Sequence, residues 1–188
     1  MTRQIFIDTA NIEDIRIWKD RGIFAGVTTN QKLFLTEKGV DFKKTVIQMC
    51  KTAKVPMTPD GMGLNVIKKL KNVGIKTNAT LMMSFEQMFL AIISGATYAS
   101  IFYNRSKDAG YDPDEIIRRT RDFIDGGSYK SQIITGSIRN IRDVGNAFAA
   151  GSDIVTIPPK ILDLMLQEEM TRKTMEEFDA AWKAFKKN

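Results

Sequence analysis

Short β-rich runs alternate with amphipathic helical stretches along almost the whole chain, and this alternation constrains the fold most. The run 5–9 is followed by a helical pattern that begins after Asn11, a favoured N-cap residue. Strands that alternate with helices of about 10–15 residues indicate βαβ units and a parallel sheet. The other expected strands are 26–29, 76–83, 98–103, 131–135 and 153–158, and the other expected helices are 41–53, 61–73, 85–94, 112–125, 141–150, 160–169 and 171–186.

Six strands are too few for a closed barrel. A (β/α)8 barrel has eight strands and typically ~250 residues, with ~200 at the low end. This chain has 188 residues. It shows no low-complexity segment and no linker, so we expect residues 1–188 to form a single α/β domain.

Composition excludes several kinds of catalytic site. The chain contains no histidine, which excludes Ser-His-Asp and Cys-His nucleophiles and every His-ligated metal site. The single Cys50 excludes an internal disulfide framework and a multi-cysteine zinc site. Catalytic chemistry must therefore come from Lys, Asp, Glu, Ser, Thr, Tyr and Arg, and we expect no metal.

The net charge of +6 is spread along the chain, with its densest runs at 68–71, 118–119 and 186–187. Dispersed basic residues favour solvated helix faces and local phosphate sites over a nucleic-acid groove. No apolar run approaches the ~20 residues that span a bilayer, and Asp8 falls where a signal peptide needs apolar residues. We therefore expect a cytoplasmic protein without nucleic-acid or membrane partners.

Polar side chains gather at the ends of the expected strands, where parallel barrels carry their functional groups. A lysine among apolar neighbours loses proton affinity, so it can attack a carbonyl and form a Schiff base. Asp8 is the acid that can then move protons, and Arg105, Ser137 and Arg139 suit a phosphate. The strand-end residues are Asp8, Thr28, Thr29, Asn30, Lys54, Asn78, Thr80, Ser100, Phe102, Tyr103, Asn104, Arg105, Ser137 and Arg139.

Each of these residues also has a purely structural interpretation. Asp8 could form an Asx-turn or cap the helix near Asn11. Lys54 could end the helix 41–53, where a cation interacts favourably with the helix dipole. Arg105 and Arg139 could be ordinary surface residues. Spacing alone leaves these alternatives open.

Several ordered motifs resemble the small transaldolase family, which also includes fructose-6-phosphate aldolases. The resemblance spans residues 5 to about 185, although Gln31 stands where the family usually has Pro. The segment 54–61 resembles the family's Lys-Ile/Val-Pro-x-Thr stretch, which carries the Schiff-base lysine. The other matching segments are 6–11, 26–30, 74–81, 94–98 and 136–140.

The resemblance implies a (β/α)8 TIM barrel that transfers a dihydroxyacetone unit between sugar phosphates, a reaction of the pentose phosphate pathway, with no cofactor. It implies Lys54 as the nucleophile, Asp8 as the acid/base and Thr80 as the residue that orients the catalytic water. The implied substrate-binding residues are Thr28, Asn30, Asn78, Ser100, Phe102, Arg105, Ser137 and Arg139. Phe102 favours transaldolase, because the aldolase branch tends to have Tyr there. Fructose-6-phosphate aldolase is the alternative.

One departure from the family is large. Relatives have a third strand, its helix and the start of a fourth strand between Cys50 and Lys54, where this chain has only three residues. Either the chain truly lacks this unit or the sequence as given omits it, and the cost of unpaired sheet edges favours an omission. Lys54 could then be the Schiff-base lysine or a helix-end residue. A true deletion could leave an inactive sugar-phosphate-binding protein.

The C-terminal stretch 170–185 carries apolar residues at helical spacing. Such a stripe more often packs on its own domain. The resemblance adds the expectation of a homo-oligomer, because small members of the family form rings in which the terminal helix reaches a neighbour.

Overall fold

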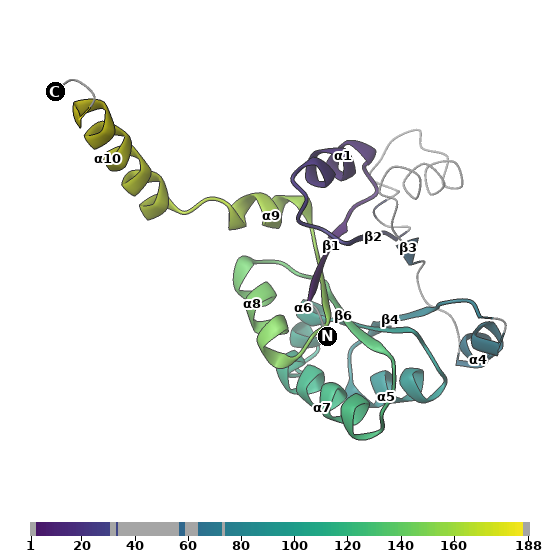
Figure 1. Ribbon diagram of the computed structural model, residues 1–188. Coiled ribbons are helices and arrows are strands. Elements are labelled where there is room, and N and C mark those ends of the chain that lie inside the picture. The colour runs from purple at the N-terminus through teal and green to yellow at the C-terminus, as the bar shows by residue number, and fades with distance from the viewer. Residues whose placement is uncertain (1–2, 31–32, 34–56, 59–63, 73, 186–188) are drawn as a thin grey trace.

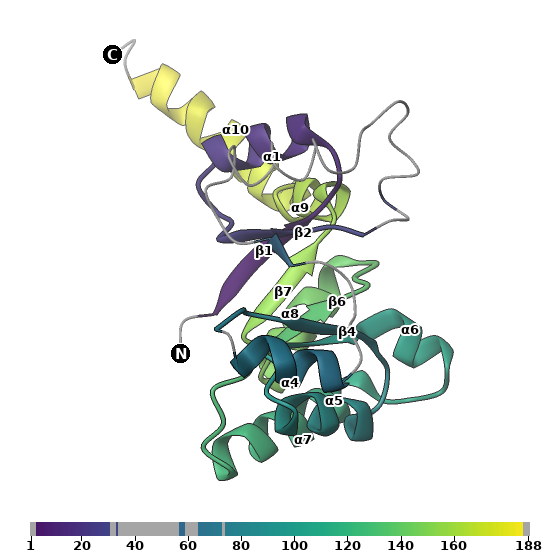
Figure 2. The same ribbon diagram turned by 90° about the vertical axis from the view of Figure 1, so that its right-hand side faces the viewer.

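The computed structural model describes residues 3–30, 33, 57–58, 64–72 and 74–185. Within these residues, seven parallel strands form one sheet in the order β3-β2-β1-β7-β6-β5-β4. Their bounds are β1 Gln4–Asp8, β2 Gly26–Thr28, β3 Met57–Thr58, β4 Asn78–Met82, β5 Tyr98–Phe102, β6 Gln132–Gly136 and β7 Ile154–Ile157. Figure 2 shows β1, β7 and β6 side by side in this order.

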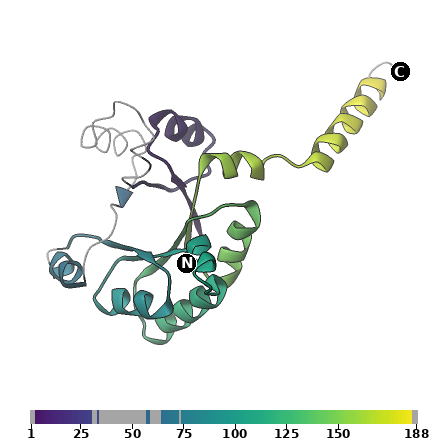
Figure 3. The same ribbon diagram turned by 180° about the vertical axis from the view of Figure 1, so that it is seen from behind.

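Helices alternate with the strands, as the sequence predicted. Their bounds are α1 Ile12–Asp20, α4 Leu64–Asn72, α5 Phe85–Ile93, α6 Tyr103–Asp108, α7 Pro113–Gly126, α8 Ile141–Ala150, α9 Pro159–Met165 and α10 Glu169–Phe185. Four of them begin at a side chain that accepts hydrogen bonds from the first-turn amides: Asn11, Ser84, Asp112 and Asn140. In Figures 1 and 3, α5, α7 and α8 lie along the outer side of the curved sheet.

The core lies between this sheet and its outer helices. Ile7, Ile101 and Val155 of the strands and Ile117 and Ile124 of α7 are all fully buried. Burying such a side chain contributes roughly 1.5–3 kcal/mol each. The strands are therefore anchored along their length, and their carboxyl ends share one edge of the sheet.

A close approach of β1 and β2 depends on a glycine. Phe6 stands opposite Gly26 in the register of the two strands. A Cβ at Gly26 would lie 2.5 Å from the Phe6 ring. The absence of a side chain at this position therefore lets the ring pack over β2.

The parallel α/β architecture is confirmed, but a closed eight-stranded barrel is not seen. In the described part of the chain, β3 pairs only with β2, through Val27 opposite Met57 and Thr28 opposite Thr58, and no pair joins it to β4. The segment that follows Pro56 thus enters the sheet directly beside β2. The expected helix 41–53 lies outside the described residues.

Two local expectations differ from the structure. The strand predicted for 98–103 ends at Phe102, and the helix α6 follows at once, with Tyr103 buried and its hydroxyl donating to Asp114 Oδ1 at 2.7 Å. The C-terminal helix α10 has no buried residue, so its apolar stripe does not pack on the domain. Figure 1 shows α10 extending away from the sheet beyond α9. No helix among the described residues is long and apolar enough to cross a membrane.

Candidate functional site

A cavity opens where six of the strands bring their polar side chains together. Parallel strands place their carboxyl ends at the same edge, so residues that are distant in sequence meet there. The lining residues are Asp8, Thr28, Thr29, Asn30, Asn78, Thr80, Ser100, Phe102, Arg105, Ile134, Gly136, Ser137 and Thr156.

The structure brings nine of the eleven residues proposed from the sequence into this one cavity. They are Asp8, Thr28, Asn30, Asn78, Thr80, Ser100, Phe102, Arg105 and Ser137. Of the other two, Lys54 lies outside the described residues, and Arg139 does not line the cavity. Their individual roles stay predictions.

A chain of hydroxyl groups leads to Asp8. Thr28 Oγ1 donates to Asp8 Oδ1 at 2.8 Å and lies 2.5 Å from Thr156 Oγ1. A threonine hydroxyl has one proton, so Thr156 donates to Thr28 when Thr28 donates to the carboxylate. A protonated Asp8 can reverse the direction of both bonds. The arrangement therefore suits a carboxyl group that gains and loses a proton.

The helix-capping alternative for Asp8 is not what the structure shows. The cap of α1 is Asn11, whose side chain accepts from the amides of Glu13 and Asp14. The amide of Asn11 itself donates to Thr9 Oγ1 at 3.0 Å. Asp8 instead lines the cavity and accepts the Thr28 hydroxyl.

An amide and two hydroxyls provide further polar groups in the cavity. Ser100 Oγ donates to Asn78 Oδ1 at 2.6 Å, and both residues are buried. This bond orients the Asn78 amide so that its nitrogen remains a donor. The Thr29 hydroxyl is buried and has no hydrogen-bond partner within the described ranges. An unpaired buried hydroxyl costs free energy, so a polar ligand or water at this point would be stabilised.

Asn30 combines a structural contact with its place in the cavity. Its Oδ1 accepts the amide of Leu33 at 3.1 Å. This bond orients the Asn30 side chain, which also lines the cavity.

The basic part of the cavity lies beyond β5 and β6, where Arg105 and Ser137 line it. The Arg105 guanidinium lies over the Phe102 ring, with 5.0 Å between Cζ and the ring centroid. Arg105 forms no ion pair with any carboxylate in the part of the chain that is described. Ser137, directly after β6, has φ +60°, a left-handed conformation unusual for an L residue. Arg105 and Ser137 therefore bring a positive charge and a hydroxyl-bearing residue to the same cavity.

Arg139 is held elsewhere by an acidic partner. Its guanidinium donates through two nitrogens to the carboxylate of Asp108, with Nη1 to Oδ1 at 2.9 Å. This hydrogen bonding raises the pKa of Arg139 and lowers the pKa of Asp108. Both side chains are about half exposed, so the pair contributes little to stability. Its consequence is that the charge of Arg139 is already balanced.

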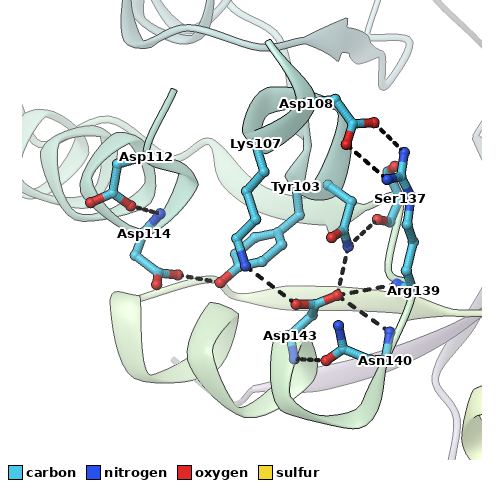
Figure 4. A network of polar contacts seen from close by, with 10 residues as sticks. Tyr103, Lys107, Asp108, Asp112, Asp114, Ser137, Arg139, Asn140 and Asp143 are labelled. Carbon is cyan, nitrogen blue, oxygen red and sulfur yellow. Dashed lines mark hydrogen bonds and ion pairs between the residues drawn. The ribbon is translucent and has the colours of Figure 1, made fainter. Parts of the chain in front are cut away.

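Sequence reasoning missed a buried network beneath this loop, which is drawn in Figure 4. Asp143 accepts from Asn104 Nδ2 at 2.6 Å and from the amides of Arg139 and Asn140. Burial would raise the pKa of Asp143, but these hydrogen bonds and the charge of Lys107 outweigh it and hold the pKa below its usual range. Asp143 is therefore ionised at neutral pH.

Two signals in the sequence could have identified Asp143 and Thr156, to which the sequence analysis gave no role. Asp143 follows Asn140 by three positions, which is the spacing of a capping box. Thr156 is the one hydroxyl in a run of branched apolar residues, at the end of an expected strand. The rule that assigned the other strand-end residues would have included it.

Known proteins resemble this chain in fold and in sequence. Thiamine phosphate pyrophosphorylase from Pyrococcus furiosus shares the fold, with a TM-score of 0.58 over 82% of this chain and 85% of that chain, at 14% identity. A family model described as Transaldolase/Fructose-6-phosphate aldolase matches residues 46–188. A probable transaldolase of Carboxydothermus hydrogenoformans is 35% identical and covers 98% of this chain and 100% of the relative. One of Nitrosopumilus maritimus is 34% identical and covers 97% of this chain and 96% of the relative.

The alignment with the Carboxydothermus relative bears on the strand and helix that the sequence lacks between Cys50 and Lys54. The match to the Carboxydothermus relative extends over 216 positions, more than the 188 residues of this chain. That relative therefore contains residues that have no counterpart here.

Proposed function

Because the chain belongs to the transaldolase/fructose-6-phosphate aldolase family, we propose that it is a transaldolase that acts on sugar phosphates. It transfers a dihydroxyacetone unit from a ketose phosphate to an aldose phosphate. The observation that carries the proposal is the convergence of Asp8, Arg105 and Ser137 on one cavity. This convergence supports the proposal, because the mechanism needs a carboxyl group for proton transfer and a cation and a hydroxyl for a phosphate in the same cavity.

The proposed reaction begins with covalent attack. The amine of Lys54 attacks the ketone carbon of the sugar phosphate, and loss of water gives an iminium. Cleavage of the bond between the α and β carbons sends its electron pair toward the iminium nitrogen and leaves an enamine. The hydroxyl on the β carbon loses its proton to Asp8 and becomes the carbonyl of the departing aldehyde. The reverse steps with a second aldehyde, which takes the proton back from Asp8, complete the transfer.

The other cavity residues hold the substrate in this scheme. Asn30, Asn78 and Ser100 bind hydroxyl groups, and Thr80 orients the water that leaves and returns. Arg105 and Ser137 bind the phosphate, which is anchored at the far end from the bond that breaks. Remote binding of this kind positions the reacting carbons.

Trapping the covalent intermediate tests the proposal. Incubation with fructose 6-phosphate and borohydride should reduce the iminium and leave a dihydroxyacetone adduct on a single lysine, seen by mass spectrometry. The matched control is borohydride without sugar. Absence of an adduct on the folded protein would contradict the enzymatic proposal and favour a sugar-phosphate-binding protein without catalysis.

Aldolase activity is the second candidate, and the fate of the three-carbon unit separates the two. Phe102 lines the cavity and has no hydroxyl with which to donate a proton, which favours transfer over release. With an aldose phosphate acceptor present, a transaldolase forms a new ketose phosphate. An aldolase releases free dihydroxyacetone.

Substituting the two arginines should separate their roles. Arg105→Ala should raise KM for a phosphorylated aldose by roughly 10–100-fold, the size of a lost hydrogen bond to a charged group. Arg139→Ala should raise it by less than about fivefold, because Asp108 already binds its guanidinium. In both variants KM for the same aldose without phosphate serves as the control. A larger effect of Arg139→Ala than of Arg105→Ala would show that Arg139 leaves Asp108 to bind the phosphate.

We propose that α10 packs against another copy of the chain. Met175, Phe178 and Phe185 are 62%, 71% and 72% exposed, and Phe185 stacks on Trp182. An apolar surface of this kind is typical of protein interfaces. Phe178→Asp combined with Phe185→Asp should lower the mass measured by light scattering, whereas Arg172→Ser on the same helix should not. A monomeric unmodified protein would contradict this proposal.

A further inference from the structure

The loop between β6 and α8 is held in a backbone conformation that needs support. Ser137 adopts φ +60° and lines the cavity, so its place in the cavity depends on the loop keeping this form. L residues seldom occupy this region without being constrained by their surroundings. The contacts that constrain Ser137 come from α6, on the other side of the loop.

Asn104 holds the carbonyl of Ser137 with two donors. The backbone amide of Asn104 donates to Ser137 O at 3.3 Å, and its Nδ2 donates to the same oxygen at 2.8 Å. Asn104 is itself buried, with 7% of its surface exposed. Asn104 lies directly before Arg105 in α6. The helix that carries Arg105 is therefore also hydrogen-bonded to the loop that carries Ser137.

Asp143 holds the other end of the same loop. Its Oδ2 accepts from the amide of Arg139 at 3.2 Å and from the amide of Asn140 at 3.3 Å. The same oxygen accepts from Asn104 Nδ2 at 2.6 Å. This hydrogen bond links Asn104 and Asp143, the two residues that hold the loop. The amides of residues 139 and 140 are thus occupied by a side chain that is 2% exposed, and they are not open to a phosphate.

The charges around the loop are arranged in pairs. Lys107 Nζ lies 3.5 Å from Asp143 Oδ1, and Arg139 is paired with Asp108. Of the three cations Arg105, Lys107 and Arg139, Arg105 is thus the one that forms no ion pair within the described residues. Figure 4 shows both ion pairs. A phosphate that binds here depends on Arg105 and on Ser137 being held at the right separation.

We propose that Asn104 and Asp143 are positioning residues that fix Ser137 relative to Arg105 and so set the preference of the cavity for phosphorylated substrates. This inference rests on the proposed function, because it needs the phosphate to lie between Arg105 and Ser137. Neither positioning residue lines the cavity, so both act through the loop.

Two simpler roles of Asp143 predict different effects of its substitution on phosphate affinity. If Asp143 served only as the capping-box residue of α8, its loss would lower stability and leave phosphate affinity unchanged. If it acted only through its charge, removing a negative charge near the site would tighten phosphate binding. Positioning predicts the opposite sign, which is weaker binding.

The test measures the affinity for inorganic phosphate by calorimetry, which does not require turnover. Asn104→Ala should weaken binding about tenfold, the effect of one misplaced hydrogen bond to a charged group. Asp143→Asn should weaken it about threefold, because a neutral oxygen accepts the loop amides less strongly than a carboxylate. Ser106→Ala is the matched control: Ser106 is buried in the same helix and donates to Phe102 O at 2.9 Å, away from the loop.

Kinetics supply a second readout. In Asn104→Ala, KM for glyceraldehyde 3-phosphate should rise about tenfold, while KM for glyceraldehyde and kcat stay within about twofold of the unmodified enzyme. Unchanged phosphate affinity in Asn104→Ala, or tighter binding in Asp143→Asn, overturns the inference. If Asn104→Ala fails to fold, the sign of the change in Asp143→Asn decides.

The proposed function and this inference fail in distinguishable ways. If the unmodified protein binds no phosphate, the proposed phosphate site is wrong and the positioning role falls with it. If the unmodified protein binds phosphate and the variants bind it equally well, only the positioning role is wrong.

Discussion

Replacing Lys54 with Met is expected to abolish turnover and to prevent trapping of the substrate by borohydride. Methionine has a chain of similar length but no amine, so no iminium can form. Loss of the nucleophile in a covalent mechanism lowers kcat by at least about a thousandfold. Steady-state kinetics with fructose 6-phosphate and a phosphorylated aldose give the size of the loss, and circular dichroism shows whether the fold is kept.

Lys51→Met is the matched control, because it makes the same chemical change three residues earlier in the chain. It should retain activity and form the adduct. Turnover that survives in Lys54→Met would place the Schiff base on another lysine and support the interpretation of Lys54 as a helix-end residue. Mass spectrometry of the trapped peptide would then identify the reacting lysine.

Asp8→Asn is expected to lower kcat by about 10²–10⁴-fold, with a much smaller change in KM. An amide cannot exchange the proton that the broken bond requires, and general acid–base catalysis contributes about this factor. The amide oxygen can still accept the Thr28 hydroxyl, which bonds Asp8 Oδ1 at 2.8 Å. The cavity should therefore keep its shape, and the loss reports on proton transfer.

The chain offers a matched control for Asp8→Asn. Asp14 also accepts a threonine hydroxyl, that of Thr9 at 2.9 Å, but it lies on α1 and does not line the cavity. Asp14→Asn should therefore keep kcat within about twofold. An unchanged kcat in Asp8→Asn would instead show that another group moves the proton.

Much of the secondary structure could be predicted because its signals are local. Asn11, Ser84 and Asp112 cap helices through amides two or three residues away, so the contact is contained in the sequence pattern. The end of β5 was less predictable. Tyr103 continues a β-rich run, but its burial and its bond to Asp114 of α7 place it in a helix.

Much of the candidate site was also predictable, for a geometrical reason. Parallel strands place their carboxyl ends together whatever the details of packing, so polar residues such as Asp8 and Arg105 were expected to meet. Arg139 shows the limit of this rule. Its partner Asp108 lies 31 residues away on a different element, and nothing local to either residue indicates the pair.

The sequence by itself determined the parallel α/β class, the sites of helix capping and the family, because each depends on residues that are near neighbours or on motifs read in order. The tertiary structure decided which groups touch. It paired β2 directly with β3, joined Thr156 to Asp8 through Thr28, tied Asn104 to Asp143 and left α10 exposed. These outcomes depend on contacts between segments that are far apart in the chain. Whether such segments meet depends on the packing of the whole sheet and its helices, which no local pattern contains.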